Sequence, residues 1–175
     1  MSAQTSMSTP PESFGALAAR QAITDHIYRY CRAVDRLDIP LGHSIWHAGG
    51  VADYPGYYQG PGPGVIDLIC ENHRGLLHHS HQVTNILIAL NGEAAGSESY
   101  CTATLRLQRG GALVQMMVWS RYIDSWSLKN GRWALDKRIA IRDFDEMREV
   151  TAMAQYDVGR RDAGDPSYAV LRTPA

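Results

Sequence analysis

Residues 112–141, ALVQMMVWSRYIDSWSLKNGRWALDKRIAI, decide the fold class of this chain. Asn130-Gly131 divides the stretch into two segments that are rich in β-branched and aromatic residues. Asn-Gly is typical of a type I′ turn, which joins antiparallel strands, because that turn needs a positive φ at both central residues. The stretch therefore predicts a β-hairpin, with one strand over 112–128 and the next over 133–141.

The preceding sequence extends this hairpin into a meander. Two further β-rich segments lie over 81–90 and 94–108, and the breaks NGE and RGG separate the segments. Upstream of them the apolar residues recur at helical spacing, and strands and helices do not alternate along the chain. Helices followed by an antiparallel meander, with one early strand, indicate an α+β fold.

Three helices are expected before the meander. The first covers residues 13–37, with Ser13 as its N-cap and an apolar stripe at helical spacing. Pro40 opens a second, shorter helix that holds Ile45 and Trp46, and residues 51–64 then form a short strand and a glycine-proline loop. The third helix follows, and its stripe consists of Val65, Ile66, Ile69, Cys70, His73 and Leu77.

The length of 175 residues predicts one domain with a substantial core. We expect residues 1–12, rich in Ser, Thr and Pro, to be a mobile tail, residues 13–156 to form the domain, and residues 157–175 to be an extended C-terminal tail. Within the domain, DFDEMREVTAM (residues 143–153) is expected to form a short helix after the last strand.

The composition excludes several classes of function. The 17 basic and 18 acidic residues give a net charge of −1, which lacks the basic excess that binding to nucleic acid needs. No apolar run is long enough to cross a membrane and no secretion signal is present, so we expect a cytoplasmic protein without a membrane partner. The widely spaced Cys31, Cys70 and Cys101 are expected to be reduced core residues.

The first helix ends on YCRAVDRLD (residues 30–38), where the negative end of the helix dipole disfavours a carboxylate. Two explanations of Asp35 are open: Arg32 and Arg36 screen it at the surface, or it serves a partner elsewhere in the chain. His81, at the start of a strand directly after a helix, is the candidate partner. A carboxylate that binds one imidazole nitrogen makes the other nitrogen a better base.

Other chemistries receive less support from the motifs. His79 and His81 share a predicted strand face, but a metal site needs further ligands and no Asp or Glu follows before Glu93, so we predict no metal. The glycines of GPGPG (residues 60–64) lack the spacing of a nucleotide-binding loop. No GxSxG motif marks a serine nucleophile, and no cofactor is expected.

The last strand carries two candidate binding residues, Arg138 and Arg142. A fixed guanidinium can orient a carboxylate or stabilise an enolate as charge develops. Strict alternation places both arginines on one strand face, and the opposite face is formed by Trp133, Leu135, Ile139 and Ile141. The alternative is an ordinary ion pair with Asp136, Asp143 or Asp145.

Two aromatic residues of the N-terminal region are candidates for the wall of a pocket. Tyr30 and Trp46 could line it, although aromatic residues at helical spacing are usually core residues. A buried Tyr30 hydroxyl would in either case need a hydrogen-bond partner.

The order and spacing of five segments, over residues 15–168, resemble the SnoaL-like branch of the nuclear-transport-factor-2-like superfamily. The segments are YCRAVDRLD, IWHAGGVADYPGYYQG, HQVTN, LKNGRWAL and DPSY. The resemblance implies a conical barrel, in which N-terminal helices close a curved, mainly antiparallel sheet around one deep pocket. It also implies that Asp35 and His81 form a catalytic dyad, as in the hexachlorocyclohexane dehydrochlorinase, the scytalone dehydratase and the bile-acid dehydratase of this branch.

The same resemblance implies which residues bind substrate. Tyr30 and Arg142 match the bile-acid dehydratase, whereas Trp46 and Arg138 match the dehydrochlorinase. The combination of Tyr30 with Arg142 favours loss of water over loss of chloride. Gln82 stands where the dehydrochlorinase has an aromatic residue after its histidine.

A cofactor-free lyase or isomerase is the function that the resemblance implies. It would abstract a proton from a small hydrophobic substrate, cyclic and steroid-, terpenoid- or polyketide-like. A noncatalytic small-molecule-binding or assembly domain of the same fold is the alternative. The strand over 112–128 is bulky on both faces, so a homo-oligomer is expected to cover the outer one, and the resemblance favours a trimer over a dimer.

Overall fold

The computed structural model describes residues 13–153 and 159–171. Its elements, in chain order, are α1 (Phe14–Arg36), α2 (Ile39–Ser44), β1 (Trp46–Tyr54), β2 (Tyr58–Pro61), α3 (Gly62–Arg74), β3 (His78–Asn91), β4 (Ala94–Arg109), β5 (Ala112–Lys129), β6 (Arg132–Glu149) and α4 (Ser167–Val170).

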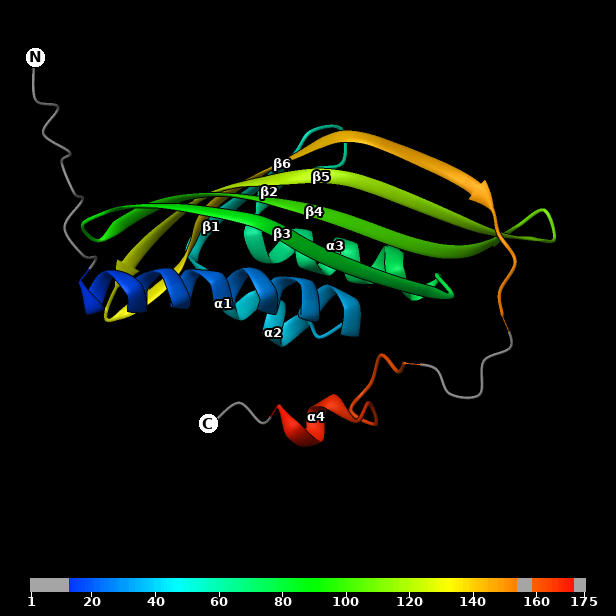
Figure 1. Cartoon of the computed structure of the whole chain (residues 1–175), viewed down its shortest axis with the longest axis horizontal. Helices are drawn as coiled ribbons and strands as arrows, with labels where there is room; N and C mark the ends of the chain where they lie inside the picture. Colours follow the sequence, from blue (N-terminus) through cyan, green and yellow to red (C-terminus); the bar gives the residue numbers. More distant parts are fainter. Residues whose placement is uncertain (1–12, 154–158, 172–175) are drawn as a thin grey trace, which may run out of the picture.

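One six-stranded sheet, in the order β2-β1-β6-β5-β4-β3, forms the scaffold. Neighbouring strands are antiparallel except β1 and β6, which are parallel. Figure 1 shows the long strands arching over α1 and α2. The sheet does not close on itself, because β2 and β3 are the edges of the described sheet. These features confirm the predicted α+β fold with a curved, mainly antiparallel sheet and N-terminal helices.

The first helix forms as its sequence predicts. The Ser13 side chain caps its N-terminus by accepting a hydrogen bond of 3.2 Å from the backbone N–H of Ala16. At the other end Leu37 adopts a left-handed conformation with φ of 54°, which stops the helix. The apolar stripe packs against the sheet and is fully or almost fully buried at Ile23, Ile27, Tyr30, Cys31 and Val34. Burial of each such side chain contributes roughly 1.5–3 kcal/mol.

The Asn130-Gly131 hairpin is confirmed. Both residues have positive φ, 53° and 75°, and Lys129 pairs with Arg132 across the turn. The β4–β5 connection uses two glycines, Gly110 and Gly111, in the same way. The three cysteines are also as expected, because Cys31, Cys70 and Cys101 are free thiols and buried. None of the described helices combines the length and apolar character needed to cross a membrane.

Two predicted boundaries in the N-terminal half are wrong. The helix opened by Pro40 ends at Ser44, so that Trp46 begins β1 instead of lying in the helix. The segment expected to hold one short strand contributes to two, because β1 and β2 form a hairpin of their own. Short helices leave few residues for a periodicity argument, and pairing with β6 decides where β1 begins.

The C-terminal half differs from the prediction in two places. Residues 143–149, expected to be helical, extend β6, because the long β5 offers partners as far as the pair Val114–Glu149. The tail is not simply extended: it carries α4 and packs on α1, where Arg32 donates to the Ser167 hydroxyl at 3.0 Å. Residues 1–12, 154–158 and 172–175, which include the predicted mobile tail, lie outside the described residues.

A β-bulge corrects the predicted faces of β6. Leu135 pairs with Trp126 and Lys137 pairs with Ser125, so Asp136 is an extra residue in the strand. The alternation therefore shifts by one position there. Leu135 and Arg138, which strict alternation places on opposite faces, are both fully buried.

The start of α3 depends on a glycine. A Cβ atom added at Gly62 would lie 2.2 Å from two ring carbons of Trp46. We expect Gly62→Ala to lower the free energy of unfolding by about 1–3 kcal/mol, because overpacking displaces a buried ring. Gly75→Ala is the matched control at the other end of α3, where an added Cβ meets nothing within 4 Å. Urea unfolding that gives both variants wild-type stability would contradict this packing.

Candidate active site

The structure brings Asp35 and His81 together. Asp35 lies one residue before the end of α1, and His81 lies near the start of β3. The Nδ1 atom of His81 is 2.7 Å from Oδ1 of Asp35, and the backbone N–H of His81 donates to both carboxylate oxygens at 3.1 and 3.0 Å. Because an ionised carboxylate only accepts, Nδ1 is the donor of this hydrogen bond, and in the neutral ring Nε2 is then the acceptor nitrogen.

These contacts decide between the two explanations of Asp35. The two arginines that could screen Asp35 at the surface have other partners. Arg32 donates to Ser167, and Arg36 lies 3.6 Å from Asp165. The side chains of His81 and Asp35 are only 7 % and 13 % exposed. A buried carboxylate needs partners, and His81 supplies them through its ring and its backbone.

His81 lines a cavity of about 680 Å³. The cavity lies over the concave face of β4, β5 and β6, between α3 and the β1–β2 turn. Most of its wall is apolar, formed by Ile69, Ala103, Leu105, Met116, Val118 and Ala140. A few polar groups in an apolar cavity of this size are typical of a small-molecule site.

Two tyrosine hydroxyls form the polar end of this cavity. The hydroxyls of Tyr30 on α1 and Tyr54 on β1 are 3.0 Å apart, and both residues line the cavity. Burial raises the pKa of each phenol above its ordinary value, so both are protonated at neutral pH. One hydroxyl donates to the other, which leaves one O–H free for a ligand. Sequence reasoning found Tyr30 but missed Tyr54, because the length of β1 was misjudged.

The two arginines are in different environments. Arg142 lines the cavity, with a side chain that is 64 % exposed and a hydrogen bond of 3.1 Å to Asp145, one of the expected partners. Arg138 is fully buried and paired with Asp124, which is not among the expected partners. Its guanidinium lies behind the tyrosines, so the structure does not place Arg138 against a substrate.

Trp46 is also absent from the lining of this cavity. It is 3 % exposed and packs under Gly62 at the start of α3. The predicted aromatic wall is instead formed by tyrosines, Tyr30, Tyr54, Tyr57 and Tyr122. The family resemblance implied a pocket position for Trp46, whereas its place at the start of β1 turns the ring into the core.

His73 is a cavity residue that sequence reasoning treated only as part of an apolar stripe. Its ring stacks on His81 with centroids 5.7 Å apart and contacts His79 at 4.6 Å. Burial, with the neighbouring His79 and His81, lowers the pKa of His73 to about 3, so the ring is neutral. His79 binds the Val34 carbonyl at 2.9 Å. Within the described residues no three His, Cys, Asp or Glu side chains are placed to hold a metal ion.

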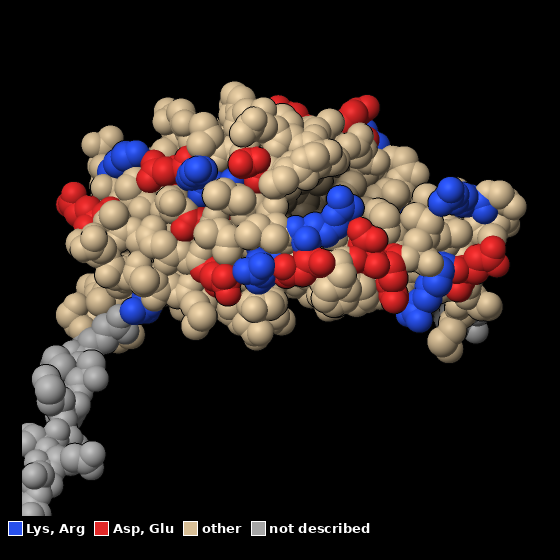
Figure 2. All heavy atoms as spheres, turned by 90° about the horizontal axis from the view of Figure 1, so that it is seen from above, with Lys and Arg blue, Asp and Glu red and all other residues tan. Residues whose placement is uncertain are grey.

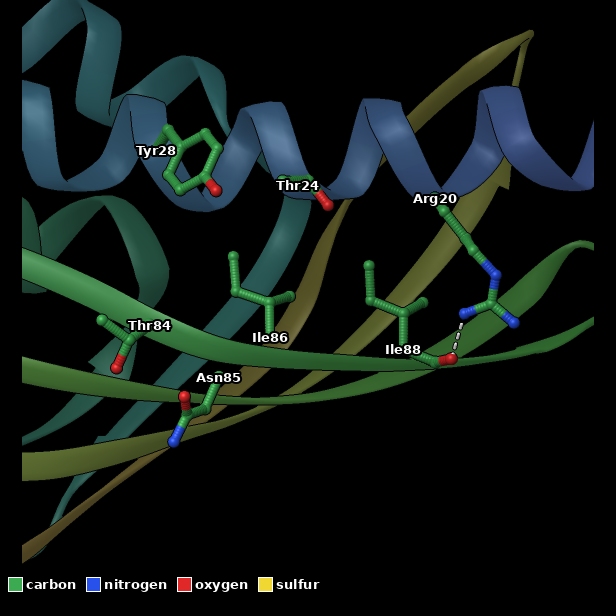
Figure 3. Close-up of a pocket in the computed structure, with 7 residues that line it drawn as sticks. All are labelled: Arg20, Thr24, Tyr28, Thr84, Asn85, Ile86 and Ile88. Carbon is green, nitrogen blue, oxygen red and sulfur yellow. Dashed lines mark hydrogen bonds between the residues drawn. The ribbon is translucent and has the colours of Figure 1, made fainter.

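Two further hollows lie along α1. One, of about 380 Å³, borders both Asp35 and His81 and is also lined by Arg29, Arg32, Arg36 and Leu171. The other, of about 360 Å³, lies between α1 and β3. In Figure 3 Thr24 and Tyr28 face Ile86 and Ile88 across it, and Arg20 reaches the Ile88 carbonyl. Neither Asp35 nor His81 lines this last hollow.

Comparison with known proteins agrees with this architecture. A family model described as "SnoaL-like domain" matches residues 15–139. A comparison with curated protein sequences finds no match.

Solved structures with the same fold have low sequence identity. A hexachlorocyclohexane dehydrochlorinase (LinA) type 2 is 17% identical, with a TM-score of 0.71, over 81% of this chain and 97% of that one. A candidate scytalone dehydratase from Novosphingobium aromaticivorans is 17% identical, with a TM-score of 0.65, over 82% and 95%. A candidate aromatic ring hydroxylase from the same species is 22% identical, with a TM-score of 0.64, over 77% and 94%. At these identities the likeness establishes the fold.

Proposed function

The chain belongs to the SnoaL-like domain family, and on that premise we propose that it is a cofactor-free lyase of the dehydratase type, or an isomerase. The observation that carries the proposal is the 2.7 Å contact between His81 and Asp35 in the wall of an apolar cavity. A structural pair would be packed over, whereas His81 borders space for a ligand. Relatives with this fold that are described as a dehydrochlorinase and a candidate scytalone dehydratase support the same class of reaction.

In the proposed mechanism Nε2 of His81 removes a proton from a carbon atom next to a carbonyl or a leaving group. Asp35 holds the ring in the tautomer that leaves Nε2 unprotonated, and it stabilises the imidazolium that forms. The free hydroxyl of the Tyr30–Tyr54 pair donates to the oxygen on which negative charge develops. Hydroxide leaves poorly unless protonated, and Tyr30 or the imidazolium supplies that proton.

The sizes of these effects fit the proposal. General base catalysis contributes roughly 10²–10⁴-fold, and one well-placed donor to an oxyanion contributes about 10²–10³-fold. Neither alone gives an enzymic rate, so the dyad and the tyrosine pair must act on one substrate. The cavity, bordered by His81 and by Tyr30 and Tyr54, is the place where both can reach it.

The cavity supports a hydrophobic and cyclic substrate. Its wall offers methyl and methylene groups from β4 and β5, and its volume lies within the roughly 300–1,000 Å³ typical of small-molecule sites. Arg142 lines the cavity with a largely exposed side chain, so it would bind a polar group at the solvent-facing end of the substrate. The substrates that we propose are steroid-, terpenoid- and polyketide-like alcohols with a carbonyl near the hydroxyl.

Screening such hydroxylated compounds by mass spectrometry tests the proposal. We expect loss of water, or isomerisation seen as a shifted retention time at unchanged mass, for at least one class. The Asp35→Asn variant is the control and should form product more slowly, by about 100-fold or more. Binding of the same compounds by wild type without any turnover would favour the noncatalytic binding domain instead.

We also propose that the chain forms a homotrimer. The outer face of the sheet exposes Tyr100 and Phe144, and Phe144 stacks on Trp119 at 4.7 Å. Figure 2 shows basic and acidic side chains interspersed on the face it displays, so charge does not keep copies apart there. Light scattering at micromolar concentration should give roughly three times the 19.4 kDa chain mass. We expect Phe144→Glu to lower this mass, and a monomeric wild type would refute the prediction.

A further inference from the structure

A buried ion pair lies directly behind the tyrosine end of the cavity. Asp124 on β5 and Arg138 on β6 are paired across the sheet, and both side chains are 0 % exposed. Nε and Nη2 of Arg138 donate to the two oxygens of Asp124 at 2.8 and 2.7 Å, a bidentate arrangement. The third nitrogen, Nη1, is buried and forms no hydrogen bond of ordinary geometry. The guanidinium is nevertheless close enough to the Tyr54 hydroxyl for a hydrogen bond from Arg138 to lower the pKa of that phenol.

Two aromatic rings enclose this guanidinium. Its central carbon lies 4.3 Å from the ring centroid of Tyr30 and 4.1 Å from that of Tyr122. Rings in this position separate Arg138 from the cavity, which Tyr30 and Tyr122 line and Arg138 does not. The positive charge is therefore close to the cavity, but the two rings keep it from direct contact with any ligand there.

Stability alone does not explain such a pair. Removing two charges from water costs about as much as their attraction returns, and well-packed apolar residues of similar volume often do as well or better. The strands on either side already supply an apolar core, with Trp126 and Leu135 fully buried nearby in the same two strands. The pair calls for a role that apolar residues would not fill.

We propose that Arg138 is a positioning residue for the elimination, which acts through Tyr30 and Tyr54 by holding their hydroxyls in place and strengthening them as donors to a developing oxyanion. The inference rests on the proposed function and gives its tyrosine pair a source of electrostatic support. Arg138 touches no substrate in this role.

The charge of Arg138 acts on both phenols in the required direction. It lowers the pKa of Tyr30 and of Tyr54, against the burial that raises both. Asp124 opposes it more weakly at Tyr54, because the guanidinium lies between the carboxylate and the rings. A stronger acid is a stronger hydrogen-bond donor, and in a buried site such a donor is in place before the charge forms.

Binding of 4-nitrophenol to the full chain provides a test that needs no turnover. The probe is a small aromatic phenol, and its absorbance distinguishes the bound phenolate from the bound phenol. At the pH where the free probe is half ionised, we expect wild type to bind the phenolate in preference, as an oxyanion held by the tyrosine pair. Tyr30→Phe should abolish this preference, which locates the bound probe in the cavity.

The decisive variant replaces the pair by apolar residues, Arg138→Met together with Asp124→Leu. Its preference for phenolate should fall by about tenfold or more, because the guanidinium next to the tyrosines is removed and Asp124, which is removed with it, offset that charge only in part. Arg138→Lys, which keeps the charge, should retain part of the preference. The matched control is Lys129→Met with Asp136→Leu, which removes an exposed ion pair of 2.6 Å and should change nothing.

The outcomes separate this inference from the proposed function. Equal phenolate preference in wild type and in the Arg138→Met, Asp124→Leu variant would overturn the role of Arg138, even if the enzyme eliminates water. Binding of neutral phenol alone by wild type would overturn it as well. A lost preference in that variant supports the inference whether or not the substrate screen has found a substrate.

Discussion

Turnover falls by about 100-fold or more when Asp35 is replaced by Asn or His81 by Gln. His81 acts as the general base only together with Asp35, so either change disables it. The double variant is scarcely slower than either single variant, since residues that act together are not additive. Steady-state kcat/KM with a compound from the water-loss screen measures all three. Circular dichroism establishes that each variant is folded before rates are compared.

The end of α1 offers a matched control in Asp38. Its carboxylate caps α2 by accepting from the backbone N–H of Leu41 at 3.1 Å, and it does not line the cavity. Asp38→Asn keeps a good N-cap and should leave kcat/KM near the wild-type value. Wild-type activity in Asp35→Asn or His81→Gln would refute the dyad. Equal losses of kcat/KM in Asp35→Asn, His81→Gln and Asp38→Asn would show that the effect comes from the end of α1 and not from the Asp35–His81 pair.

The pairing of Asp35 with His81 could be foreseen from sequence because both residues occupy places that local rules define. Asp35 lies where a carboxylate is poorly stabilised by its own helix, and His81 opens a strand after a helix. His81 was therefore the candidate partner of Asp35, and the family resemblance added a catalytic role for the pair. The hairpin at Asn130-Gly131 was equally predictable, because a positive φ at two successive residues permits few sequences.

The environment of Arg138 could not be foreseen, because it depends on a bulge that no local signal marks. Asp136 is an ordinary polar residue in a strand, yet its insertion shifts the side chains of residues 137–142 by one position, until a second extra residue, Asp143, shifts the alternation again. Tyr54 and His73 were missed for a related reason. Their role comes from the cavity that the sheet and α3 form together, and periodicity within one element does not report on it.

Loss of Asp124 is expected to be the most damaging single change to stability. Asp124→Ala leaves the Arg138 guanidinium buried, with its bidentate acceptor removed. Removing one partner of a buried pair costs about 3–5 kcal/mol, a large part of the roughly 5–15 kcal/mol that stabilises a typical domain. Urea unfolding at neutral pH measures this loss in the free energy of unfolding. The analysis uses one value for all variants for the dependence of that free energy on urea concentration.

A double variant without either charge completes this prediction. Arg138→Met with Asp124→Leu should recover most of the stability lost in Asp124→Ala, because no unpaired charge remains in the core. Asp136→Ala, which breaks the exposed pair with Lys129, should cost less than about 1 kcal/mol. If Asp124→Ala proves as mild as Asp136→Ala, the pair is hydrated and the charge of Arg138 is screened. If instead the Arg138→Met, Asp124→Leu variant is as stable as wild type, the buried ion pair adds nothing to stability. That result is expected if the charge of Arg138 serves the tyrosine hydroxyls.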